Sequence, residues 1–231
     1  MEEDPEPACP PPAWACEIVE ACKASLGLEV YPPSDDTFLL LETLAAEQSL
    51  WRPWPLCLEV GSGSGAVSAG LGRLLKAWQM AVDKNPEATR CSAEVLRLHR
   101  VLADVIRGSF TDCFRAGTVD LLICNPPYVP TDEEEMQGCG ISISWAGGRR
   151  GREIIDILLP KAAELLSVGG YFYLVAIKEN EPEEVLLNGH KLGLLGETAR
   201  REQRGMEELF ILRFQKPCEM EARKASRSGA I

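Results

Sequence analysis

Short apolar runs alternate with longer amphipathic stretches along most of this chain. The run at 119–124 is brief, largely apolar and bounded by turn residues, which is typical of a buried strand. The intervening stretches repeat apolar residues at helical spacing. In the helix expected at 35–48, Ser34 is the N-cap, and Phe38 and Leu41 belong to one apolar stripe.

The order of these elements predicts an α/β fold with a doubly wound, mostly parallel, Rossmann-like sheet of seven strands. Strand and helix alternate first, which favours parallel pairing, whereas no helix separates the last two strands, so the last strand should run antiparallel. Strands are expected at 56–60, 78–82, 100–103, 119–124, 171–177, 194–199 and 207–215, and further helices at 64–77, 86–99, 152–166 and 181–188.

We expect one folded domain with flexible ends. Residues 30–216 carry the alternating pattern. Residues 1–29 begin with an acidic, proline-rich segment and are expected to be a flexible extension with a short helix near 13–26. Residues 217–231 are expected to be a disordered tail.

Composition narrows the class of protein. The chain has 231 residues and a formal net charge of -11, which argues against nucleic acid as a partner. No apolar run is long enough for a membrane span, and we expect a cytoplasmic protein, with the nucleus as a further compartment. The nine cysteines include no C-x-x-C pair and there are only two histidines, so free thiols and no metal site are expected.

A glycine-rich loop follows the first strand. Gly61 and Gly63 would let the backbone approach a ligand at a helix N-terminus, and Asp83, after the second strand, could accept both hydroxyls of a ribose. This spacing also fits a dinucleotide-binding dehydrogenase. However, Glu59 would repel a pyrophosphate and could bind an ammonium, and Asp104 could accept an adenine amino group. These charges favour S-adenosylmethionine.

The sequence Asn-Pro-Pro-Tyr at 125–128 follows the apolar strand at 119–124. An Asn side chain followed by two prolines leaves mainly acceptors beside an aromatic ring. Such a cluster suits a planar NH2 group, held by its hydrogens with its nitrogen presented for attack. The motif therefore predicts N-methyl transfer.

Taken together, these motifs resemble those of the HemK-type glutamine methyltransferases, in particular their eukaryotic and archaeal release-factor branch. The resemblance runs from about Tyr31 to Lys216. It rests on Tyr31-x-Pro33-x-x-Asp36-Thr37-Phe38-Leu39-Leu40-Leu41, Cys57–Gly65, Asp83-x-Asn85-Pro86-Glu87-Ala88, Asn125–Val129, Trp145–Glu153 and Ile177–Asn180. The Asn-Pro-Pro-Tyr motif alone is shared with adenine-N6 methyltransferases, whereas the Trp-Ala-Gly-Gly-Arg loop is more specific.

The resemblance implies S-adenosylmethionine as cofactor and the glutamine of a Gly-Gly-Gln motif in a class-1 translation termination factor as substrate. Asn125, Pro126 and Tyr128 would be the catalytic residues. The implied cofactor site comprises Thr37, Glu59, Gly61, Gly63, Asp83, Asp104, Val105 and Asn125. The implied substrate site comprises Asn125, Pro126, Pro127, Tyr128, Trp145 and Arg149.

The same resemblance implies a heterodimer with a small zinc-binding activator subunit, which would cover the edge strand near Asp104. The connection between the helix at 86–99 and Asp104 is several residues shorter than this family leads us to expect. Alternative activities are lysine methylation on histone tails and adenine-N6 methylation of DNA. A catalytically silent scaffold is a further alternative.

Several residues also have a purely structural interpretation. The glycine loop could be a tight turn, Asp104 a helix cap and Tyr128 a loop anchor. The basic loop at 138–151 could be a solvated edge.

Overall fold

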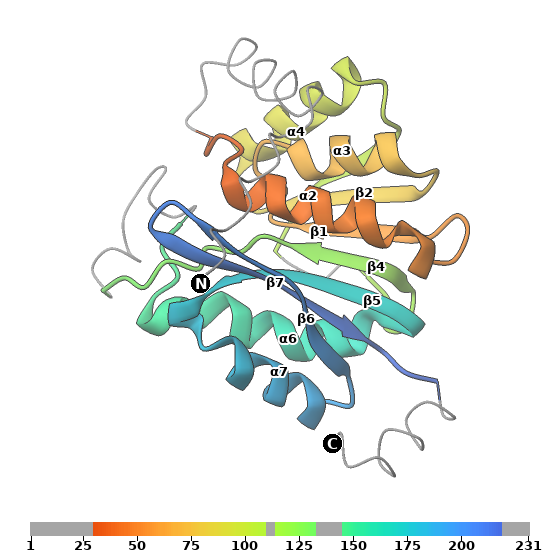
Figure 1. Cartoon of the computed structure of the whole chain (residues 1–231). Helices are drawn as coiled ribbons and strands as arrows, with labels where there is room; N and C mark the ends of the chain where they lie inside the picture. Colours follow the sequence, from red (N-terminus) through yellow and green to blue (C-terminus); the bar gives the residue numbers. More distant parts are fainter. Residues whose placement is uncertain (1–29, 110–113, 133–144, 219–231) are drawn as a thin grey trace, which may run out of the picture.

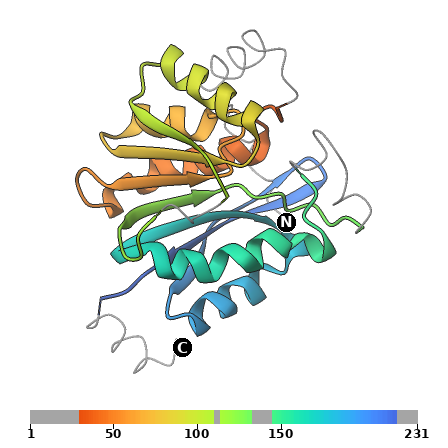
Figure 2. The same cartoon turned by 180° about the vertical axis from the view of Figure 1, so that it is seen from behind.

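A seven-stranded sheet runs through the middle of the molecule, and helices cover both of its faces (Figures 1 and 2). The computed structural model describes residues 30–109, 114–132 and 145–218. The expected N-terminal extension 1–29, and the tail beyond residue 218, lie outside the described residues.

The strand order is β3-β2-β1-β4-β5-β7-β6. The strands are β1 (Leu56–Val60), β2 (Trp78–Asp83), β3 (Ala103–Arg107), β4 (Val119–Cys124), β5 (Leu166–Ile177), β6 (Leu195–Arg204) and β7 (Glu207–Gln215).

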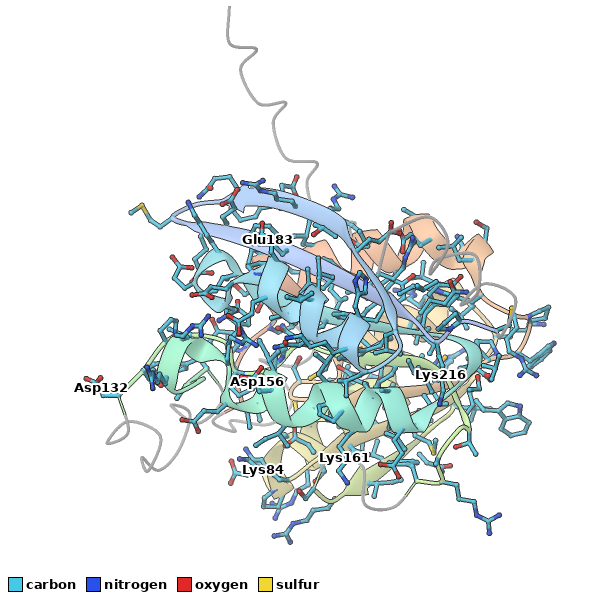
Figure 3. All side chains as sticks on the ribbon, turned by 90° about the horizontal axis from the view of Figure 1, so that it is seen from below. Lys84, Asp132, Asp156, Lys161, Glu183 and Lys216 are labelled. Atoms are coloured by element: carbon cyan, nitrogen blue, oxygen red, sulfur yellow. The ribbon has the colours of Figure 1, made fainter. Side chains whose placement is uncertain are left out.

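The pairing confirms the mixed sheet. Strands β1 to β5 run parallel to one another, and β7 is antiparallel to both β5 and β6. The α-helices are α2 (Asp35–Glu47), α3 (Ala66–Leu74), α4 (Pro86–Leu98), α6 (Glu153–Leu165) and α7 (Pro182–Lys191), and the short 3-10 helices are η1 (Gln48–Leu50), η3 (Arg149–Gly151) and η4 (Lys178–Asn180). Helices α2, α3 and α4 lie on one face, and α6 and α7 lie side by side on the other (Figures 1 and 3).

The core lies between the sheet and these two layers. The central strand β4 is buried along its whole length, as expected for a parallel strand covered on both faces. Cys57 and Cys124 are buried in β1 and β4, where they pack as small apolar side chains. The largest fully buried side chains are Tyr173, Phe172, Phe214, Leu39, Leu40, Leu44, Leu58, Leu121, Leu122, Ile123 and Ile155.

The prediction of a third strand at 100–103 was wrong. Arg100 adopts a left-handed conformation (φ 56°) at the end of α4, and the Val101 N–H closes the turn on the Leu96 carbonyl. The strand therefore starts only at Ala103. The apolar Leu102, which favoured the earlier start, is 91% exposed.

Other boundaries also differ from the expectation: β6 ends at Arg204 instead of residue 199, and α7 ends at Lys191 instead of residue 188. Helix α3 is shorter than 64–77, because residues up to Gly65 belong to the glycine loop and Leu75 is extended. Strand β5 begins at Leu166 instead of Tyr171. It includes Gly169, whose φ of 81° and bond from its N–H to the Lys216 carbonyl (2.7 Å) accommodate an irregular start.

Candidate active site

A cavity of about 710 Å³ lies at the carboxyl ends of the central strands. This is the edge at which open α/β sheets bind ligands, because the loops that leave β1, β2 and β4 meet there. Ten of the residues expected from the sequence line it: Thr37, Glu59, Gly61, Gly63, Asp83, Asn125, Pro126, Pro127, Tyr128 and Trp145.

The glycine loop after β1 forms the floor of one half of the cavity. Gly61 (φ 78°) and Gly63 (φ 50°) have positive φ, which favours glycine. The Gly63 N–H donates to one Asp83 carboxylate oxygen (2.9 Å), and the Asn85 N–H donates to the other (2.8 Å). Asp83 thus joins the two strand ends and presents its carboxylate to the cavity, with room for further donors on each oxygen.

Glu59 is the buried acid of this half. Its Oε2 accepts the backbone N–H of Ser68 (3.0 Å) and the Ser68 hydroxyl, and its side chain is only 6% exposed. Burial raises the pKa of the Glu59 carboxyl to about 8, although both Ser68 bonds lower it. A cation in the cavity would favour the ionised form.

Asp36, on the first turn of α2, holds the Asn-Pro-Pro-Tyr segment. Its Oδ2 accepts the Asn125 side-chain Nδ2–H and the Tyr128 hydroxyl, both at 2.9 Å. Its Oδ1 accepts the backbone N–H (2.6 Å) and hydroxyl (3.1 Å) of Thr37. Asp36 is buried, so this carboxylate determines how the two side chains are oriented.

The Asn125 side-chain oxygen has no hydrogen-bond partner among the described residues, although it is buried. Because Asp36 binds the Asn125 Nδ2, the group left without a partner is the side-chain oxygen of a residue that lines the cavity. A buried acceptor without a donor costs about 1–3 kcal/mol, which an incoming N–H could recover. A ligand with an N–H donor would therefore satisfy the Asn125 side-chain oxygen.

Tyr128 is a donor at neutral pH. Burial, followed by the neighbouring Asp36 charge, raises the pKa of its phenol well above the usual range. Tyr128 is thus suited to hold Asp36 and to offer a ring face, and it cannot act as a base.

The loop from Trp145 to Arg152 packs directly on the segment that follows Tyr128. The Val129 N–H donates to the Trp145 carbonyl (3.1 Å), and the Gly147 N–H donates to the Val129 carbonyl (2.8 Å). Trp145 lines the cavity, whereas Arg149 is exposed outside its lining. The structure therefore brings the predicted substrate residue Trp145, but not Arg149, to the cavity.

Two other arginines of this loop are engaged in ion pairs. Arg150 pairs with Glu181 and with Glu184 (2.6 Å). Arg152 is buried and pairs with Asp156 (2.6 Å) and Glu184 (3.1 Å), which links the loop to α6 and α7. The alternative of a solvated basic edge thus fits Arg149 and not Arg152. Residues 138–144 of the predicted loop lie outside the described residues.

Asp104 and Val105 do not line the cavity. The inference that Asp104 ends the third strand was wrong, because β3 runs from Ala103 to Arg107 and Asp104 pairs with Met80 near the strand's beginning. Gly108 and Ser109 occupy the strand's carboxyl end and line the cavity instead.

Three residues of the cavity wall come from the β6–β7 hairpin: Arg204, Glu207 and Leu209. Sequence reasoning missed them, because nothing in the sequence shows that the hairpin tip reaches the strand ends of β1 and β4. Burial, followed by the charge of Asp36, then Glu179 and Asp35, raises the pKa of Glu207. The hairpin thus contributes one acid and one arginine to the cavity wall. Asp36 was also missed as a site residue. Its position in the first turn of a helix, before an apolar stripe, could have shown that it is buried.

Metal ions have no evident place in the described part of the chain, where no group of three or more His, Cys, Asp or Glu side chains could hold one. Among the described helices, none combines the length and apolar character needed to cross a bilayer.

Comparison with known proteins identifies the family. A family model described as methyltransferase small domain matches residues 35–139. The Methyltransferase HEMK2 of Mus musculus is 47% identical over 195 residues, which cover 81% of this chain and 90% of the mouse protein. The chain belongs to the HEMK2 family of methyltransferases.

Other members and the fold agree with this assignment. The eRF1 methyltransferase catalytic subunit mtq2 of Schizosaccharomyces pombe is 32% identical over 205 residues, covering 80% of this chain and 89% of the yeast protein. The E. cuniculi Mtq2 structure, solved as an Mtq2–Trm112 complex, is similar in fold with a TM-score of 0.65 at 24% identity, covering 82% of this chain and 99% of that one. This HEMK2-family chain is thus a methyltransferase with the expected sheet.

Proposed function

We propose that this HEMK2-family enzyme transfers a methyl group from S-adenosylmethionine to the side-chain amide of glutamine in the Gly-Gly-Gln motif of a class-1 translation termination factor. The observation that carries the proposal is the buried, unpartnered Asn125 oxygen beside Tyr128. An amide NH2 is the group that such an acceptor fits. The name of the S. pombe relative, an eRF1 methyltransferase subunit, supports the substrate.

The residues present fit the cofactor. Positive-φ glycines let the loop approach a ligand, the buried Glu59 suits a cationic group, and Asp83 can accept ribose hydroxyls. Asp104 has no part in this fit, and an adenine amino group would meet the backbone around Gly108 and Ser109. When bound, S-adenosylmethionine supplies an electrophilic methyl group on a sulfonium.

The enzyme's own residues act mainly by positioning. The Asn125 Oδ1 and the Pro126 carbonyl accept the two N–H groups of the substrate amide, and the Tyr128 ring lies beside it. An amide nitrogen is a poor nucleophile, because its lone pair is delocalised. Acceptors on its hydrogens favour the positive charge that develops on nitrogen. Alignment can contribute up to about 7–11 kcal/mol in favourable cases.

The methyl transfer does not require a general base from the described part of the cavity wall. The Asp36 carboxylate is occupied by Asn125, Tyr128 and Thr37, and the Tyr128 phenol stays protonated. The proton leaves the methylated amide after transfer, when its acidity is greatest.

The test compares three acceptors with labelled S-adenosylmethionine: a termination factor, a histone tail and an adenine-containing DNA duplex. The proposal predicts label on the termination factor alone, located on the glutamine amide by mass spectrometry and absent when that glutamine is replaced by alanine. Label on the factor that survives this replacement contradicts it.

Lysine on histone tails is the second candidate substrate, and the acidic residues in and near the cavity wall favour it. Asp35 and Glu207 line the cavity, and Glu179 is close enough to raise the pKa of Glu207. A cationic side chain would be attracted there. The same acids and the net charge of -11 oppose a DNA substrate.

We further propose that a small zinc-binding activator subunit covers the edge strand β3. This strand ends the sheet, and the apolar Leu98 (43% exposed), Trp78 (70%) and Leu102 (91%) surround its beginning. An exposed edge with apolar neighbours is a surface for strand addition. The E. cuniculi structure, in which Mtq2 is in complex with Trm112, supports a partner subunit.

A further inference from the structure

Asn180 lies outside the cavity lining, directly behind the Asn-Pro-Pro-Tyr segment. It is the last residue of η4, which follows β5, and its side chain is fully buried. The strand β5 neighbours β4, with Leu174 paired to Cys124, and continues three residues further to Ile177. The sheet therefore brings Asn180 next to the segment that leaves β4.

All hydrogen-bonding groups of the Asn180 side chain are used. Its Oδ1 accepts the Ile177 N–H (2.8 Å), which fixes the amide on its own strand. Its Nδ2 donates to the Tyr128 carbonyl (2.8 Å) and to the carbonyls of Arg150 (2.9 Å) and Gly151 (3.3 Å). One amide thus ties together the end of β5, the segment after β4 and the 145–152 loop.

As a result, both the carbonyl and the N–H of the peptide group between Tyr128 and Val129 are hydrogen-bonded. Its oxygen accepts from Asn180, and its Val129 N–H donates to the Trp145 carbonyl. The fit is tight, since a Cβ on Gly151 would overlap the Tyr128 carbonyl oxygen. The Tyr128 hydroxyl is fixed separately by Asp36. The Asn180 side chain connects the Tyr128 carbonyl to the Arg150 and Gly151 carbonyls of the 145–152 loop.

We propose that Asn180 is a positioning residue for methyl transfer. It holds the hydrogen-bond acceptors of residues 125–128 and the Trp145 side of the cavity in their relative positions around the substrate. This inference rests on the proposed function of the same cavity. The hydrogen bonds of Asn180 go to Ile177, Tyr128, Arg150 and Gly151 and not to the glycine loop or Asp83, so its loss should disturb the substrate half and spare the cofactor half. A shift of about 1 Å in such a site can cost about 10²-fold in rate.

The experiment compares Asn180→Asp and Asn180→Ala with Asn188→Ala, a control on the neighbouring helix α7 whose side-chain oxygen accepts from Lys191 (3.0 Å). Assays run well below each variant's melting temperature, measured in parallel. We expect kcat to fall by about 10²-fold in both Asn180 variants, while the dissociation constant of S-adenosylmethionine, measured by calorimetry, changes less than about threefold. The control should match the wild-type enzyme.

A second readout does not need a substrate. Hydrogen exchange at the Val129 and Thr131 amides, which donate to Trp145 and Gly148, should become faster in the folded Asn180→Ala protein and not in Asn188→Ala. Unchanged exchange, or cofactor affinity lost together with kcat, overturns the inference. Wild-type enzyme that binds the cofactor but does not methylate the termination factor refutes the proposed function instead, and the exchange result still decides the role of Asn180.

Discussion

At the scale of single residues, the site depends on one carboxylate that sequence reasoning did not assign to it. Asp36 binds the Asn125 amide and the Tyr128 hydroxyl through the same oxygen. Asn125 and Tyr128 were recognisable because Asn-Pro-Pro-Tyr is a continuous motif after a strand. The partner that orients them lies 89 residues earlier in the chain than Asn125, and only the packing of α2 on the sheet brings it there.

Replacing Asp36 with alanine should therefore impair catalysis more than cofactor binding. The Asn125 amide and Tyr128 hydroxyl would lose their acceptor, at about 1–3 kcal/mol for each buried group. We expect kcat to fall by about 10²-fold, with the melting temperature lowered as well. Glu183→Ala, which removes an acid from the first turn of the exposed side of α7, is the control. Steady-state kinetics and calorimetric unfolding check this, and wild-type kcat in Asp36→Ala would refute it.

Glu59 predicts a pH dependence. A carboxyl whose pKa is raised to about 8 binds more protons in the folded state, so its contribution to stability declines as pH rises from about 4.5 to 8. A cationic cofactor needs the ionised form. Its affinity should therefore increase with pH between about 6 and 8, by at most about tenfold per unit, with proton release.

Calorimetric titration of S-adenosylmethionine in buffers of different ionisation enthalpy measures this proton release. In Glu59→Gln, which cannot ionise, the pH dependence and the linked proton should both disappear. A wild-type affinity that stays flat across this range would show that Glu59 is already ionised in the free enzyme.

At the scale of elements, most helices and strands could be predicted because their hydrophobic periodicity agrees with their final burial. Strand β4 is an apolar run that is fully buried, and Pro86 does begin α4. The third strand failed because Leu102 and Val101 look like strand residues although they form a turn and an exposed edge. The error moved Asp104 to the wrong end of β3. The hairpin tip at Arg204 and Glu207 was not predictable, since its place depends on the strand order.

The edge strand β3 gives a prediction at this scale. Leu102→Asp places a charge on the most exposed apolar residue next to the strand, so it should weaken binding of the activator subunit by at least about tenfold, and leave the unfolding temperature of the isolated chain nearly unchanged. Val168→Asp, which alters a similarly exposed residue on β5 (69%), is the control. Pull-down titration or calorimetry measures both. Equal binding of the activator subunit by the two variants would show that β3 is not part of the interface.

At the scale of the whole molecule, the fold separates two tasks. The carboxyl ends of β1 and β2 form the half of the cavity that fits a cofactor, and the end of β4 forms the half that fits a planar amide. Residues of helix α2 and of the β6–β7 hairpin also line the cavity. The acidic surface and the cavity together fit a protein substrate better than a nucleic acid.

The central claim is that the unpartnered Asn125 oxygen holds the amide that is methylated. The most direct measurement is single-turnover methyl transfer to the termination factor by Asn125→Ala beside wild-type enzyme, with cofactor affinity determined for both. We expect label at the Gly-Gly-Gln glutamine to fall by at least about 10²-fold in Asn125→Ala, while S-adenosylmethionine remains bound. Transfer at the wild-type rate by this variant would contradict the account.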